Sequence, residues 1–153
     1  MSDLSDDLPA LPVTFRPGRT RAVLLTAATA LFAAISAVAL LLERISPPER
    51  LSFIFTGALL AGVPVLLARP KAVADDSGVT VVNIISRRRL AWAEILRVNL
   101  RPGDPWVFLD LSDGTSLPVL AIQPGIARQR ALTDARTLRA LVEARSIPDP
   151  ERS

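Results

Sequence analysis

Residues 22–42 read AVLLTAATALFAAISAVALLL and contain no charged side chain. Because an α-helix rises about 1.5 Å per residue, this stretch is about 31 Å long as a helix and matches the thickness of a bilayer core. A second uncharged stretch, LSFIFTGALLAGVPVLLA at residues 51–68, follows after an interval of eight residues. The two stretches predict a transmembrane helical hairpin over residues 21–69, with spans at 22–42 and 51–68.

Basic residues flank the predicted hairpin on both outer sides. Three arginines lie at positions 16–21, and Arg69 and Lys71 follow the second span. The connecting residues 43–50 carry two arginines that are offset by two glutamates. Because Lys and Arg near a span are retained in the cytoplasm, the pattern predicts a plasma-membrane protein with two spans and both termini cytoplasmic. Pro47 and Pro48 favour a tight polar turn between the helices.

Composition excludes several classes of site. The chain has 153 residues, a net charge of +3, and neither cysteine nor histidine. Thiol nucleophiles, imidazole bases and Cys or His metal sites are therefore excluded, and no acidic cluster has metal-ligand spacing. The small net charge argues against nucleic-acid binding, and the absence of charges inside the spans argues against transport. We predict a non-catalytic protein with no cofactor, no metal and no nucleic-acid partner.

The residues outside the hairpin divide into two tails and one domain. Residues 1–20 are polar, acidic and proline-containing at their start, which predicts a disordered cytoplasmic tail. Residues 146–153 contain two prolines and predict a second disordered tail. Residues 70–145 remain for a single folded domain.

Small residues at four-residue spacing in the spans, such as Gly57 and Ala61, fit packing within the hairpin or against a partner subunit.

The pattern of residues 70–145 predicts an antiparallel sheet closed by one helix. Residues 79–85 are rich in β-branched side chains and predict a strand. Residues 96–100 predict a strand with Leu96, Val98 and Leu100 on one face, and residues 106–111 predict a strand in which Val107, Leu109 and Leu111 lie opposite Trp106, Phe108 and Asp110. Asp113-Gly114 is a hairpin signal, and Pro118 indicates an edge in the strand at 116–122. Residues 123–145 then change to a helical period, with a shared face of Ala131, Ala135, Leu138 and Val142.

Residues 69–145 resemble the bacterial PH-like (pleckstrin-homology-like) domain of small actinobacterial membrane proteins, including the low-molecular-weight protein antigens. The matching features are the residues 76–79 that open a strand, the Arg87-Arg88-Arg89 triplet ahead of residues 92–95, the Asp113-Gly114 turn and the closing helix. The resemblance implies a membrane α-hairpin plus an α+β domain. That domain is an antiparallel PH-like β-sandwich or barrel closed by one C-terminal amphipathic helix.

The resemblance also bears on lipid binding. Phosphoinositide-binding PH domains place basic residues around their first hairpin turn, whereas the first turn predicted here contains Asp75 and Asp76. Inositol phosphate binding at that turn is therefore not expected.

Two features are candidate binding residues. The triplet Arg87, Arg88 and Arg89 is either a solvated hairpin tip or a surface that faces anionic lipid headgroups together with Arg69 and Lys71, at about 1 kcal/mol per residue near the membrane. Trp106, beside a proline-containing loop, is either a core aromatic or part of a partner surface.

The sequence therefore predicts a membrane-anchored PH-like module. Its partners are the lipid bilayer and either a protein or an anionic lipid at the inner face of the plasma membrane. The alternative is an accessory subunit of a larger integral membrane complex, held through the helical hairpin.

Overall fold

The computed structural model describes residues 8–146. The predicted tails at 1–7 and 147–153 lie outside the described residues. The chain forms two compact units. One is the helical hairpin Gly18–Arg69, and the other is a domain that combines the residues before position 18 with those from position 70 onward.

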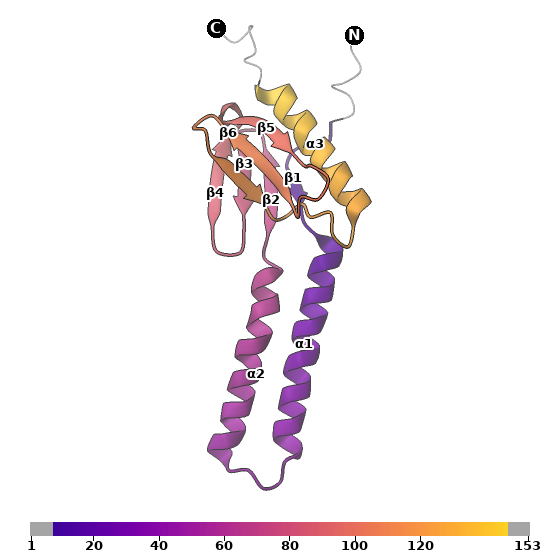
Figure 1. Cartoon of the computed structure of the whole chain (residues 1–153). Helices are drawn as coiled ribbons and strands as arrows, with labels where there is room; N and C mark the ends of the chain where they lie inside the picture. Colours follow the sequence, from indigo (N-terminus) through magenta and orange to yellow (C-terminus); the bar gives the residue numbers. More distant parts are fainter. Residues whose placement is uncertain (1–7, 147–153) are drawn as a thin grey trace. The chain divides into compact units, whose positions relative to one another are not determined.

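The hairpin consists of α1 (Gly18–Leu41) and α2 (Pro47–Leu67), as Figure 1 shows. Both helices are long and apolar enough to cross a membrane. The prediction that Pro47 and Pro48 form the turn is wrong, because they are the first residues of α2. The Ser46 hydroxyl accepts a hydrogen bond from the Glu49 amide, and the Glu49 carboxylate accepts one from the Ser46 amide at 2.7 Å. This reciprocal cap satisfies amides that would otherwise lack partners, and proline suits the first helical turn.

Small side chains allow α1 and α2 to pack closely. Gly57 and Ala61 of α2 are buried, as are Ala28 and Ala39 of α1. A Cβ atom at Gly57 would lie 3.0 Å from a methyl carbon of Ile35. At the end of α1, the Arg50 guanidinium donates to the carbonyls of Ala39 (3.0 Å) and Leu42 (3.2 Å). An arginine of α2 thus satisfies carbonyls that the helix itself cannot.

The domain contains two antiparallel sheets and a C-terminal helix, α3 (Arg128–Ser146). The first sheet has the order β1-β2-β3-β4: β1 (Val13–Phe15), β2 (Lys71–Asp75), β3 (Gly78–Val82) and β4 (Arg87–Ala91). A 3-10 turn, η1 (Trp92–Glu94), leads into the second sheet, which has the order β5-β6-β7: β5 (Ile95–Asn99), β6 (Val107–Leu111) and β7 (Ser116–Val119). This is the predicted PH-like α+β fold, and Pro118 lies in an edge strand as expected.

Strand β1 corrects the prediction of a disordered tail at 1–20. Val13 pairs with Ala74 and Phe15 pairs with Ala72, so β1 is an antiparallel neighbour of β2. The Phe15 side chain is only 3% exposed and belongs to the domain core. Gly18 and the residues after it already belong to α1. The hairpin is therefore the connection between the first two strands of the sheet, and the Asp75-Asp76 turn is the second connection, not the first.

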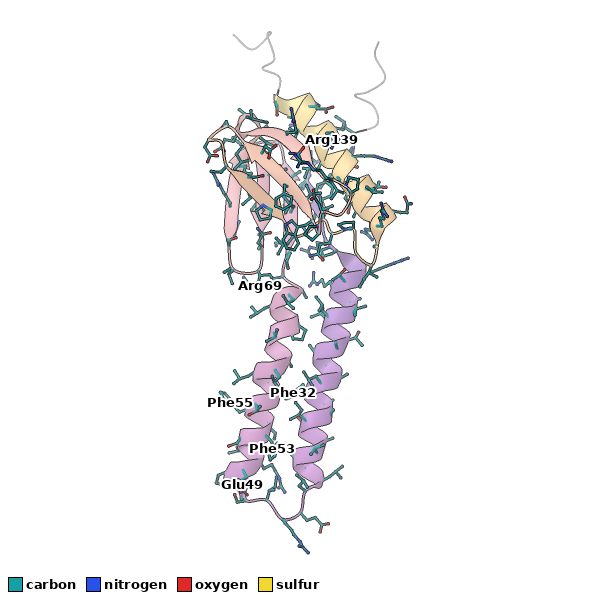
Figure 2. The ribbon with its side chains drawn as sticks, in the orientation of Figure 1. Phe32, Glu49, Phe53, Phe55, Arg69 and Arg139 are labelled. Atoms are coloured by element: carbon teal, nitrogen blue, oxygen red, sulfur yellow. The ribbon has the colours of Figure 1, made fainter. Side chains whose placement is uncertain are left out.

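The core lies between the inner faces of the two sheets and α3. Alternate residues of β2 and β6 are buried, as are Val79 and Val81 of β3 and Leu90 of β4. The predicted helix face is confirmed, since Ala131, Ala135, Leu138 and Val142 are all buried. The Arg139 guanidinium of α3 also donates to the Val98 carbonyl of β5 at 2.9 Å, and Figure 2 labels this side chain.

One strand face was predicted incorrectly. The register between β5 and β6 shifts between Ile95 and Arg97, as in a β-bulge. A bulge inserts an extra residue and so changes which side chains point inward. Ile95 and Val98 are consequently buried, whereas Leu96 is 66% exposed.

Candidate functional site

Three connections of the domain lie at one end of the first sheet, which we call the hairpin end. They lead from β1 to α1, from α2 to β2, and from β3 to β4. Phe15, which ends β1, pairs with Ala72 near the start of β2. Lys71 pairs with Val82, which pairs with Arg87, so the loop at residues 83–86 also lies there. The turns at residues 76–77 and 112–115 lie at the opposite end, which we call the distal end.

Asn83 fixes the conformation of the loop at 83–86. Its side chain is buried, donates to the Pro118 carbonyl at 2.9 Å, and accepts from the Leu120 amide at 3.2 Å. Its backbone amide donates to the Ser86 carbonyl at 2.8 Å. With the loop held in this way, the Ile85 side chain is 95% exposed. The strand predicted over residues 79–85 therefore ends earlier, at Val82.

The arginine triplet is not at a hairpin tip, because it forms most of β4. Successive side chains of a strand point to opposite faces, so Arg87 and Arg89 share one face and Arg88 points to the other. Arg88 pairs with Asp113 at 3.2 Å. Arg89 pairs with Asp75 at 3.1 Å and donates to the Ser77 hydroxyl. Arg88 and Arg89 therefore bind to carboxylates at the distal end.

The distal carboxylates have lowered pKa values for local reasons. Hydrogen bonds from the Ser77 hydroxyl and amide, followed by the charge of Arg89, lower the pKa of Asp75. Hydrogen bonds from Thr115 and then from Arg88 lower the pKa of Asp113. Both carboxylates are thus ionised at neutral pH, so they neutralise the two arginines that they contact.

The remaining predicted residues are Arg69, Lys71, Arg87 and Trp106. Lys71 and Arg87 lie in one cross-strand row on the outer face of the first sheet, with Val82 between them. Arg69 is exposed in the link that follows α2, where Figure 2 labels it. Among the described residues, neither Lys71 nor Arg87 forms an ion pair. The hairpin end thus keeps a smaller set of basic residues than the sequence predicted.

Trp106 precedes β6 and is half-buried. Its ring is tilted by 50° against that of Phe108, with 6.4 Å between the centroids. Its indole Nε1 atom is buried and has no acceptor among the described residues. Trp106 therefore packs within the domain against Phe108. Its role in a partner surface stays a prediction.

Comparisons with known proteins agree with the fold of the domain. Residues 69–141 match the bacterial PH domain family. The match begins after β1 and the hairpin. PH-like domains are generally binding modules rather than enzymes, and the two apolar helices suggest association with a membrane.

Relatives occur in mycobacteria. An uncharacterized protein of Mycobacterium tuberculosis and one of Mycobacterium bovis are each 37% identical to this chain over 93 residues. The aligned region covers 61% of this chain and 59% of each relative, so the chain spans about three fifths of the curated relatives it matches. No solved structure matches the chain.

Proposed function

We propose that this chain is a membrane-anchored PH module whose hairpin end binds anionic lipid headgroups at the inner face of the plasma membrane. One observation carries the proposal. The end of the domain that is linked to both apolar helices also holds the Lys71–Arg87 row and the exposed Ile85 side chain.

The short links support this orientation. Two residues separate β1 from α1, and three separate α2 from β2. An extended chain covers at most about 3.6 Å per residue, so the links reach no further than about 14 Å. If α1 and α2 span the bilayer, the hairpin end is held at the level of the headgroups.

The chemistry of this end fits a lipid surface. Basic side chains near an anionic membrane contribute about 1 kcal/mol each, so Lys71 and Arg87 together contribute about 2 kcal/mol. Burial of an isoleucine side chain away from water contributes about 1.5–3 kcal/mol. Ile85, in the loop that joins Val82 to Arg87, is therefore suited to enter the interface while the charges contact phosphates.

Amide hydrogen exchange of the full chain in nanodiscs tests the proposal. We expect the amides of residues 84–86 to exchange more slowly in nanodiscs that contain phosphatidylglycerol than in pure phosphatidylcholine. The Lys71→Gln/Arg87→Gln variant should lose this difference. The matched control Arg97→Gln/Arg136→Gln removes two exposed charges elsewhere and should keep it. Equal exchange in both lipids would contradict headgroup binding and favour an accessory subunit held through the hairpin.

Cysteine labelling tests the topology, because the native chain has no cysteine. Glu43 is exposed in the loop between α1 and α2, and Ser112 is exposed at the distal end of the domain. In intact cells, a membrane-impermeant maleimide should label Glu43→Cys and should label Ser112→Cys only after the membrane is opened. The opposite pattern would place the domain outside the cell.

A further inference from the structure

A groove of about 460 Å³ lies between the β5–β6 loop and the start of α3. The Val107 amide donates to the Ile122 carbonyl at 3.1 Å, and Asn83 binds the backbone at Pro118 and Leu120. These bonds place the groove at the hairpin end of the domain. Its lining combines two short proline- and glycine-containing segments with the first turns of α3: residues 100–105, 124–125, 128 and 132.

The lining of the groove is basic. Arg101 and Arg128 both line it, are exposed, and form no ion pair within the described part of the chain. The one acidic lining residue, Asp104, accepts a hydrogen bond from the Arg101 backbone amide at 2.8 Å and so stabilises the loop. Guanidinium groups bind phosphate oxygens through paired hydrogen bonds, which a groove with two arginines can provide.

One exposed apolar side chain follows the lining segment at residues 124–125. Ile126 is 60% exposed and adjoins the lining residue Gly125. In the described part of the domain, the large exposed hydrophobic side chains are Ile85, Leu96 and Ile126, and two of these three lie in loops of the hairpin end. A ligand that matches both the arginines and Ile126 has a charged part and an apolar part.

We propose that this groove binds the phosphate-bearing headgroup of one anionic lipid, with Arg101 and Arg128 on the phosphate and Ile126 beside the upper acyl chain. The inference rests on the proposed function in one respect, that the hairpin end faces the bilayer. It uses residues distinct from Lys71, Arg87 and Ile85, so the two proposals can fail separately.

Native mass spectrometry of the full chain in detergent micelles tests the groove. We expect one phosphatidylglycerol molecule to be retained per chain, at concentrations at least tenfold below those needed for phosphatidylcholine. Arg101→Gln/Arg128→Gln should weaken phosphatidylglycerol binding at least tenfold without changing the melting temperature. The control Arg97→Gln/Arg136→Gln should bind like the parent. Ile126→Ser should weaken lipid binding severalfold.

Three outcomes would overturn the proposal. The first is unchanged phosphatidylglycerol binding by Arg101→Gln/Arg128→Gln. The second is competition by inorganic phosphate at the same concentrations as the lipid, which would make the groove a site for soluble phosphate. The third is equal binding of both lipids. If any of these occurs while residues 84–86 remain protected in anionic nanodiscs, the groove assignment fails and the proposed function stands.

Discussion

Replacing Phe15 with alanine is expected to lower the free energy of unfolding of the domain by about 3–5 kcal/mol, as is typical for the truncation of a buried phenylalanine. Phe15 is 3% exposed and lies in a strand that precedes the hairpin, and its strand pairs with β2. The measurement is tryptophan fluorescence of the full chain during thermal or urea unfolding. Both tryptophans, Trp92 and Trp106, lie in the domain, so the signal is independent of the helices.

Thr14 provides the matched control for this prediction. It lies in the same strand, is exposed, and pairs with Val73 on the outer face. Thr14→Ala should change the free energy of unfolding by less than about 1 kcal/mol, since surface substitutions are usually small in effect. Equal stability of Phe15→Ala and the parent would show that β1 does not belong to the domain.

The substitution Leu138→Asp is expected to leave the domain unfolded. Leu138 is fully buried on the face of α3 that packs against the sheets. Even truncation to alanine should cost about 2–5 kcal/mol, and an unpaired buried carboxylate adds a large desolvation penalty. Far-ultraviolet circular dichroism and tryptophan fluorescence should show loss of the folded domain.

Thr133→Asp is the control on the same helix, because Thr133 is exposed. It should leave the melting temperature within a few degrees of that of the parent. A Leu138→Asp variant with the parent melting temperature would contradict the packing of α3 on the sheets.

The features that composition and periodicity determine could be predicted from the sequence. The uncharged stretches specify two long apolar helices, and the 3.6-residue period specifies the buried face of α3. The strand β6 was also predicted with Val107, Leu109 and Leu111 on one shared face, which is buried in the structure. In these cases the secondary structure and the buried face follow from the pattern of residues that are close together in the sequence.

Features that depend on distant partners could not be predicted. β1 has only three residues and is a strand because it pairs with β2, which follows the hairpin in the sequence. Leu96 is exposed because of a bulge that only the register with β6 defines. The family match also begins at residue 69 and so does not include β1.

The candidate site depends on register in the same way. A run of three arginines indicates one basic surface, yet strand alternation and the Asp75 and Asp113 carboxylates separate Arg88 and Arg89 from Arg87. The loop position of Ile85 depends on the hydrogen bonds of Asn83 to a strand end that is distant in sequence. The lining of the groove likewise comes from two separate loops and α3.

The central claim is that the hairpin end of the domain faces the bilayer, and a comparison of two spin labels tests it most directly. In proteoliposomes that contain phosphatidylglycerol, a nitroxide is attached to a single cysteine that replaces Ile85 at the hairpin end or Ser112 at the distal end. We predict that the label at position 85 collides more often with apolar oxygen than with a water-soluble nickel chelate, and that the label at position 112 shows the reverse. Equal access of the nickel chelate to both labels, or a deeper position for the label at 112, would contradict the account.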